Sequence, residues 1–270
     1  MTSHTNDARR RLLATLPALA LTPLARADDA SALADAVHGR PVGRDVTTLS
    51  RMELAERGRE PRVRRLVTYR LDRGRGESAY LARFLDPKDI AGVGLLSLTR
   101  ADGSTDQSLF LPELDRVRKV SGDRKGGRFV GSDLYFEDLQ ERKPQRDTHR
   151  LLGREVLAGV TCDILESVPV DADDSVYLKR LNWIDRTTAM ALRIDYFERD
   201  PQTVSKRWLA LERQRIQGFW TVTTSSMADL AQGSETRLIV ESARYDRKLP
   251  DRLFTPRALA DERYESEFRL

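Results

Sequence analysis

The sequence predicts a mainly antiparallel β protein of the α+β class, and three observations support this prediction. Strand-length segments follow one another in pairs, with turn residues between the members of each pair at near-regular spacing. Helix-forming segments are scarce, and the strand segments are too long and too continuous for alternating βαβ units. We therefore expect a curved antiparallel sheet, or a partly closed barrel, of about ten strands with helices against its open face.

The predicted elements begin with a short helix over residues 30–38, which has Leu33, Ala34 and Val37 on one face. Alternating apolar and polar residues, bounded by turn signals such as Gly, Asp and Thr, then indicate strands. We expect these strands over residues 46–56, 63–71, 78–85, 95–99, 107–111, 151–156, 162–168, 177–184, 190–197, 208–216, 219–225 and 236–245. The other expected elements are short helices over residues 134–142 and 226–231 and a C-terminal tail over residues 250–260.

An export signal is predicted at the N-terminus. Residues 9–11 are three arginines, residues 12–24 form a short apolar run, and residues 25–27 give the small-x-small pattern at which signal peptidases cleave. The apolar run is too short to cross a bilayer as a helix, since that takes about 20 residues. We therefore expect residues 1–27 to be a cleaved signal peptide and residues 28–270 to form a single domain in the periplasm. The paired arginines also fit twin-arginine export, so the Sec and twin-arginine routes both stay open.

Charge and composition argue against several classes of function. The chain has a formal net charge of +4, but the predicted signal holds four arginines and one aspartate, so about +1 remains after cleavage. A nearly neutral protein lacks the basic surplus that a phosphate backbone requires, and we expect no nucleic-acid partner. Cys162 is the only cysteine, so no internal disulfide can form, and we expect it to be buried as a small apolar side chain. His38 and His149 lack the spacing of metal ligands, and we expect neither a metal nor a cofactor.

The segment over residues 121–139 breaks the hairpin pattern. It begins with a flexible Lys-Gly-Gly-Arg stretch and carries carboxylates on Asp133, Glu137 and Asp138. A long loop inside a compact domain is usually functional or mobile. Three uses stay open at this point: Ser132 or Asp133 caps a short helix, the carboxylates bind a cation or act as acid and base, or the segment is a recognition loop at the mouth of a cavity. The carboxylate spacing matches neither an EF-hand nor a zinc motif.

The same segment resembles the signature of a known family. Residues 129–133 (FVGSD) followed by residues 137–139 (EDL) resemble the Phe-Met-Gly-Ser-Asp-Phe-x-Tyr-Glu-Asp-Leu signature of the outer-membrane lipoprotein-sorting protein family. Val130 replaces the methionine, Leu134 the first aromatic residue and Phe136 the tyrosine, which keeps the bulk and loses a hydroxyl. Supporting similarities follow in the expected order at residues 84–87, 92–96, 109–114, 116–120, 159–162, 183–185 and 253–255.

The resemblance implies a LolA-like fold, which is an unclosed antiparallel half-barrel with short helices across its concave face and an apolar cavity beneath them. It also implies a periplasmic carrier or chaperone that binds lipid or lipoprotein acyl chains beside a membrane transporter of the resistance-nodulation-division (RND) type. The motif residues that it assigns to the functional loop are Phe129, Gly131, Ser132, Asp133, Glu137 and Asp138.

The concave-facing strand residues would then line the cavity, and residues 30–38 and 126–139 would form its lid. Such a cavity shields apolar surface whose hydration costs about 0.8 kcal/mol per CH₂ group. The lining residues that we expect are Val67, Tyr69, Tyr80, Phe84, Leu109, Leu111, Trp183, Ile194 and Phe219.

Two other functions remain as alternatives to the carrier. A sensor or adaptor of the same fold would bind a lipid or peptide and report to a membrane partner, through a charged outer face that includes Arg62, Arg64 and Arg70. An enzyme would use the three carboxylates of the 121–139 segment. We expect no catalytic residues and favour the carrier.

Overall fold

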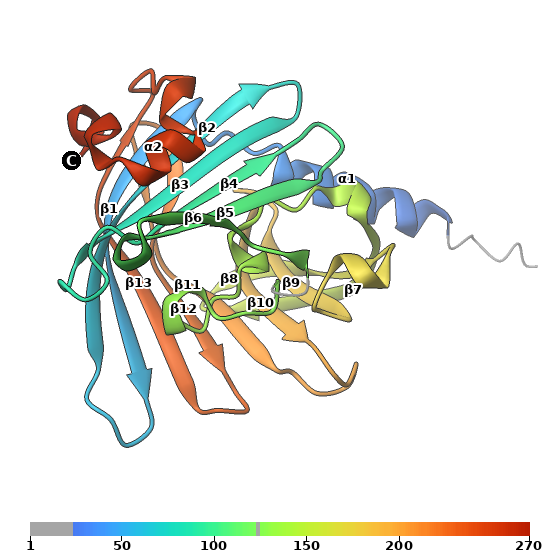
Figure 1. The fold of residues 1–270 in the computed structure, drawn as a ribbon. Helices are drawn as coiled ribbons and strands as arrows, with labels where there is room; N and C mark the ends of the chain where they lie inside the picture. The colour runs from blue at the N-terminus through green and yellow to red at the C-terminus, as the bar shows by residue number, and fades with distance from the viewer. Residues whose placement is uncertain (1–23, 123–124) are drawn as a thin grey trace, which may run out of the picture.

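The computed structural model describes residues 24–122 and 125–270, and its ribbon is drawn in Figure 1. The predicted export signal lies outside these residues except for its last four, which belong to helix α1 (Leu24–His38). The helix predicted over residues 30–38 is therefore confirmed as the second half of a longer helix. Within the described ranges, no helix is both long and apolar enough to cross a membrane.

Across the described ranges, thirteen antiparallel strands form one open sheet, which confirms the predicted fold class and exceeds the predicted number of about ten strands. In chain order they are β1 (Asp45–Glu56), β2 (Arg62–Gly74), β3 (Glu77–Asp86), β4 (Gly94–Thr99), β5 (Thr105–Leu111), β6 (Arg116–Lys119), β7 (Asp147–Leu157), β8 (Val160–Pro169), β9 (Lys179–Asp185), β10 (Met190–Phe197), β11 (Lys206–Ile216), β12 (Phe219–Asp229) and β13 (Ser234–Tyr245).

Two predicted helices are wrong. Residues 226–231 continue strand β12 and its turn, because Met227 packs in a cluster with Tyr177 and Tyr196 on the sheet. Residues 134–142 hold only a short 3-10 turn, Glu137–Leu139, because the backbone oxygen of Phe136 accepts from Gln107 on β5 and the carboxylate of Asp138 accepts from the N–H of Tyr135. Strand β6 was not predicted, and it pairs with β5 although three of its four residues are charged.

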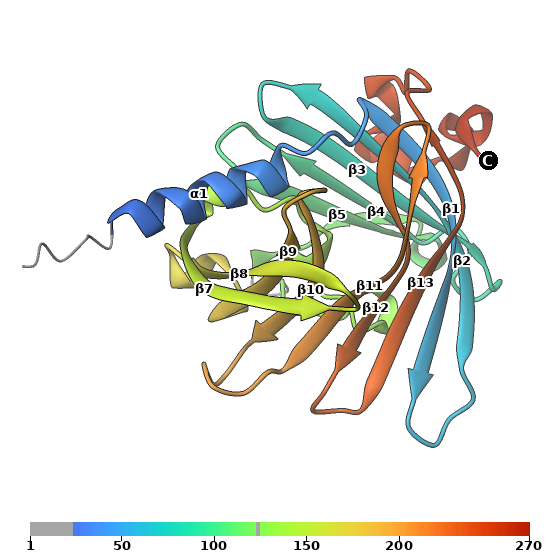
Figure 2. The ribbon, with the colours of Figure 1, turned by 180° about the vertical axis from the view of Figure 1, so that it is seen from behind.

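The strand order explains why one segment must cross the sheet. Strands β1 to β6 run outward from the middle to one edge, and β7 to β13 return from the other edge until β13 pairs with β1. Because β6 and β7 are consecutive in the chain and lie at opposite edges, the residues between them span the whole sheet. Figures 1 and 2 show the sheet curved around this connection, which lies on its concave side.

The two faces of the sheet have different covers. On the concave face, Ala30, Leu33 and Ala34 of α1 pack against Leu165 of β8 and Ile184 of β9. On the opposite face, the C-terminal tail packs over β2 to β5, and Figure 1 shows its short helices, including α2 (Pro256–Ala260), beside these strands. The predicted anchors of this tail, Leu253 and Phe254, are fully buried there.

The tail is also held by a buried ion pair. Arg83 on β3 is 1% exposed, and its Nε lies 3.2 Å from Oε1 of Glu265, whose side chain is fully buried. The same guanidinium donates hydrogen bonds to the backbone oxygens of Gly92, Ala258 and Leu259. A buried charge of this kind needs such a complete set of partners, because desolvation is otherwise costly.

Candidate functional site

The segment that crosses the concave face, residues 125–144, is called the covering segment below. Its course begins with a sharp turn in which Val130 and Gly131 take positive φ angles of 49° and 71°. Arg128 and Tyr135 then pair as an isolated β-bridge, which closes the turn. A β-branched residue such as Val130 rarely adopts the left-handed region, so the surrounding contacts must hold it there.

Asp133 fixes the covering segment to strand β13. Its carboxylate is 3% exposed and accepts hydrogen bonds from Ser234 Oγ at 2.6 Å and from Thr236 Oγ1 at 2.8 Å. It also accepts one from Arg128 Nη1 at 2.9 Å, and the same guanidinium pairs with Asp229 at 2.6 Å. All of these donors lie within the segment or on the sheet beneath it, so the carboxylate acts as an anchor.

Glu137 and Asp138 fix the next turn of the segment to strand β11 and to the residues that precede β9. Glu137 accepts hydrogen bonds from the hydroxyl of Ser175 and from the backbone N–H of Val176 at 2.7 Å. Asp138 accepts one from the hydroxyl of Tyr177 at 2.7 Å and pairs with the ammonium group of Lys206 at 3.1 Å.

Lys206 is itself a buried cation that the covering segment encloses. Its side chain is 1% exposed, and its Nζ lies 3.4 Å from the centre of the Tyr135 ring. Burial lowers the pKa of Lys206, and the carboxylate of Asp138 opposes that shift. Burial also raises the pKa of Tyr177, and the adjacent Asp138 raises it further, so this hydroxyl stays protonated and donates.

Aromatic side chains provide the apolar part of the same attachment. The ring of Phe129 lies 5.4 Å from that of Phe84 on β3 and 5.9 Å from that of Phe136, and all three are at least nine-tenths buried. Arg64 on β2 lies over the Phe84 ring at 5.7 Å and donates a hydrogen bond to the backbone oxygen of Val130. These contacts join the covering segment to β2 and β3.

The carboxylates of the segment therefore hold it in place. The first use that the sequence left open, a helix cap at Ser132 or Asp133, is not what the structure shows, because neither residue caps a helix. Ser132 Oγ donates to the backbone oxygen of Phe129 and accepts from the N–H of Leu134. The described residues contain no cluster of three or more His, Cys, Asp or Glu side chains able to hold a metal ion.

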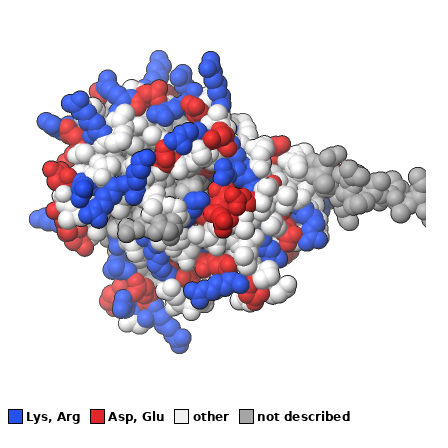
Figure 3. Space-filling model, turned by 45° about the vertical axis from the view of Figure 1, so that its right-hand side comes forward, with Lys and Arg blue, Asp and Glu red and all other residues white. Residues whose placement is uncertain are grey.

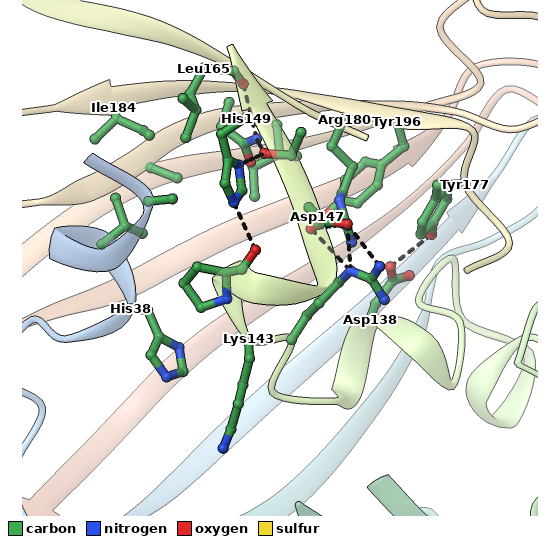
Figure 4. Close-up of a pocket in the computed structure, with 18 of the residues that line it drawn as sticks. His38, Asp138, Lys143, Asp147, His149, Leu165, Tyr177, Arg180, Ile184 and Tyr196 are labelled. Atoms are coloured by element: carbon green, nitrogen blue, oxygen red, sulfur yellow. Dashed lines mark hydrogen bonds and ion pairs between the residues drawn. The ribbon is translucent and has the colours of Figure 1, made fainter. Parts of the chain in front are cut away.

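Several cavities remain between the sheet and its covers in the described part of the chain. The first, called the α1 cavity, has a volume of about 310 Å³ and lies between the end of α1, the covering segment and strands β7 to β10. Figure 4 shows that much of its wall is polar and already paired. Asp147 bonds to Arg142 at 2.8 Å and to Arg180 at 2.6 Å, and His149 lies between Ser167 and the backbone oxygen of Pro144.

The second, called the edge cavity, is larger and more apolar. Its volume is about 590 Å³. It lies between the covering segment, the start of β4, the end of β5 and strand β6. The apolar residues that line it include Ile90, Val93, Leu109, Leu111, Val130 and Phe136. Two further cavities, of about 430 Å³ and 280 Å³, lie on the concave face on either side of Leu139.

Four of the predicted lining residues border these cavities. Leu109 and Leu111 line the edge cavity, Ile194 lines the α1 cavity, and Tyr80 lines the cavity of about 430 Å³. Phe84 points to the same face and is covered by Phe129.

The other four predicted lining residues lie elsewhere. Val67 and Tyr69 pack under the C-terminal tail, because β2 presents Leu66 to the concave face and the next residue to the opposite one. Trp183 also points away from the concavity, since its neighbour Ile184 packs against α1, and Arg193 lies over its ring at 4.1 Å. The remaining residue, Phe219, packs against the ring of Tyr245 at 4.7 Å and lines none of the described cavities.

The predicted charged outer face is wrong for Arg64, whereas Arg70 is half-buried and Arg62 is exposed. Arg64 is 7% exposed and bonds to the covering segment. Arg70 donates to the backbone oxygens of Val42 and Gly43, and Arg62 pairs with Glu56. Figure 3 shows basic and acidic side chains intermixed on the face that it displays, which agrees with a nearly neutral protein.

Comparisons with known proteins agree with this architecture. A family model described as an uncharacterized protein matches residues 76–261. No curated protein matches the sequence.

Three solved structures are similar over nearly their whole length. A domain described as an outer membrane lipoprotein-sorting protein, from Vibrio parahaemolyticus, is 25% identical with a TM-score of 0.81 over 87% of this chain and 99% of its own. A DUF1329 family protein from Desulfovibrio piger is 27% identical with a TM-score of 0.82 over the same shares of the two chains. A LolA superfamily protein from Nitrosomonas europaea, at 18% identity, a TM-score of 0.65 and coverage of 86% and 99%, shows likeness of fold alone.

Proposed function

This chain belongs to the family whose model matches residues 76–261, and it shares its fold with an outer membrane lipoprotein-sorting protein domain; from that premise we propose that it is a periplasmic carrier of lipid or lipoprotein acyl chains. The cargo chain would lie between the concave face of the sheet and the covering segment. In this role the protein binds and releases its cargo and catalyses no reaction.

The observation that supports this most is the incomplete cover of the apolar cluster around the edge cavity. Phe129 and Phe136 seal one part of that cluster, but Ile90, Leu109 and Leu111 stay partly exposed beside them. A cavity of about 590 Å³ lies within the range of about 300–1,000 Å³ typical of small-molecule sites. An alkyl chain that enters it leaves water, which is worth about 0.8 kcal/mol per buried CH₂ group.

The anchors of the covering segment support a carrier that keeps its shape without cargo. The carboxylates of Asp133, Glu137 and Asp138 tie the segment to β13, to the residues before β9 and to β11, so the space beneath it does not depend on a ligand to stay open. A preformed site also avoids the entropy cost of ordering the segment when cargo binds.

The partner and the compartment form the finer part of the proposal. We propose that the protein collects or delivers its cargo beside an RND-type transporter of the inner membrane. The family resemblance alone supports this partner, and the predicted export signal supports the periplasm.

The test begins with the full chain expressed with its signal and recovered from the periplasm. Native mass spectrometry followed by lipid extraction is expected to find a lipid or an acylated peptide at close to one per protein. Loaded protein is then mixed with acceptor vesicles, and a carrier must transfer the cargo to them.

A cavity-filling variant links the result to the site. Leu109→Trp places a larger side chain in the edge cavity and is expected to reduce both the bound lipid and its transfer. Leu152→Trp is the matched control, because Leu152 is 44% exposed on edge strand β7 and lines none of the described cavities. Bound lipid without transfer would support a sensor or adaptor, and a lipid-free protein that takes none from vesicles would contradict the carrier.

A further inference from the structure

We propose that the edge cavity selects an anionic single-chain amphiphile, meaning an alkyl chain that ends in a carboxylate or a phosphate group. This inference rests on the proposed function and adds the chemical class of the cargo. The cavity has an apolar floor and a charged rim.

The floor of the edge cavity is built from the concave side of two strands. Leu109 and Leu111 alternate along β5 toward the cavity, and Val93 precedes β4 on the same face. Val130 and Phe136 of the covering segment form the facing wall. This wall and floor offer no charged partner, so they suit an alkyl chain and leave its polar end at the opening.

The rim on the β6 side is basic. Arg118 and Lys119 line the cavity and are exposed to solvent, as is Lys88 on the turn after β3. No Asp or Glu oxygen of the described residues lies within 4.0 Å of these three cationic groups, whereas most arginines of this sheet are paired. These cationic groups therefore stand where an anionic head group at the opening can reach them.

The two carboxylates at the rim reduce this potential without reversing it, since three cationic groups stand against them. Arg128 also lines the cavity, but Asp133 and Asp229 already occupy its guanidinium. Two carboxylates line the cavity as well, on Asp89 and Glu113. Asp89 interacts with Arg64, where it opposes the lowering of the arginine pKa by burial and by Arg62.

The physical roles of floor and rim differ. Burial of the alkyl chain supplies most of the affinity, because each CH₂ group leaves water. The exposed cations supply selectivity, since each exposed ion pair adds only a modest factor and depends on salt. An anionic head gains from Arg118 and Lys119, a neutral head gains nothing from them, and a cationic head is repelled.

The experiment compares head groups on one chain length in the full-length protein. Dodecanoate, dodecyl phosphate, dodecanol and dodecyltrimethylammonium are titrated below their micelle concentrations by isothermal calorimetry, with inorganic phosphate as a head group without a chain. We expect both anionic amphiphiles to bind more tightly than dodecanol, and inorganic phosphate alone not to bind measurably. A carboxylate that binds much more tightly than the phosphate would assign the cargo to fatty acids, and the reverse would assign it to phosphate-bearing lipids.

Two double variants separate the effect of the rim cations on binding from the effect of the overall charge of the protein. Arg118→Gln with Lys119→Gln is expected to weaken both anionic amphiphiles about fivefold and to leave dodecanol unchanged, since two exposed ion pairs are lost. The control, Arg237→Gln with Arg244→Gln, removes the same charge from exposed positions of β13 that line none of the described cavities. It is expected to change the binding of neither the anionic amphiphiles nor dodecanol.

The outcomes distinguish this inference from the proposed function. If dodecanol binds as tightly as the anions and the rim variant changes nothing, the selectivity is refuted and the carrier function stands. If Leu109→Trp leaves the binding of dodecanoate unchanged, the edge cavity is not the site. If none of the amphiphiles binds, the carrier proposal for this cavity fails as well.

Discussion

Removal of the Asp133 carboxylate is the perturbation that most directly tests how the covering segment is held. In Asp133→Ala, the hydroxyls of Ser234 and Thr236 lose their acceptor while they remain buried, at 7% and 2% exposure. A hydrogen bond to a charged group contributes about 1.5–3 kcal/mol. Arg128 keeps its pairing with Asp229 and its side chain is 26% exposed, so the loss of its ion pair with Asp133 adds little to the change in stability.

The expected loss is about 3 kcal/mol in total, because two buried hydroxyl bonds are removed and water partly replaces them. Asp133→Asn keeps an oxygen that can accept one hydroxyl, and is expected to lose less than Asp133→Ala. Glu60→Ala serves as the control, since Glu60 is exposed in the β1–β2 turn, and is expected to stay within about 0.5 kcal/mol of the parent.

Two readouts are needed, because the loss can appear locally or globally. Urea unfolding reports the global free energy, and hydrogen exchange of residues 128–139 reports the opening of the covering segment. The loss is expected in at least one of them, with faster exchange of the Phe129 and Phe136 amides. If Asp133→Ala changes neither the unfolding midpoint nor this exchange, the anchor role is refuted.

Three further predictions concern the rest of the framework. Arg83→Ala should lower the free energy of unfolding by about 3 kcal/mol in urea titrations, because the buried carboxylate of Glu265 then keeps only the partly exposed Arg269 as its cation; a loss below about 1 kcal/mol would contradict the role of this pair. Phe129→Ala should cost about 3–5 kcal/mol by the same assay, and equal stability would show that the aromatic contact is dispensable. Burial raises the pKa of Asp195, but the two guanidinium groups beside it lower the pKa by a larger amount. The pKa of Asp195 in the folded protein therefore lies below its value in the unfolded chain. Its stabilising contribution is therefore present above about pH 4 and lost at lower pH, and Asp195→Asn should flatten that part of the curve of urea midpoint against pH.

Much of the sheet could be predicted because its information is local. The β1–β2 hairpin follows from alternating residues on both sides of the turn at residues 57–60, and the described structure confirms it. Strand β6 was missed because a run of three charges around Val117 has no strand pattern of its own, and it forms by backbone pairing with β5. Residues 226–231 contain good helix formers, but pairing with β11 and β13 overrides that preference.

The candidate site was less predictable, because its contacts are long-range. Asp133 stood out in the sequence, but Thr236, which bonds to it, is 103 residues away. The second difficulty was to predict which face of the sheet each strand residue points to. A shift of one residue moves a side chain to the other face, as the contrast between Leu66 and Val67 shows. No local pattern distinguishes the concave face of β2 from the face that the tail covers, since both bury apolar residues.

The measurement that tests the central claim most directly is the mapping of a photo-crosslinked acyl chain. A fatty acid with a diazirine near the end of its chain is loaded from vesicles and irradiated, and the modified peptides are identified by mass spectrometry. The account predicts adducts within residues 105–111 and 128–139, which face each other across the edge cavity, and their loss in Leu109→Trp. Adducts confined to the face beneath the C-terminal tail, or none above the level of a denatured control, would contradict it.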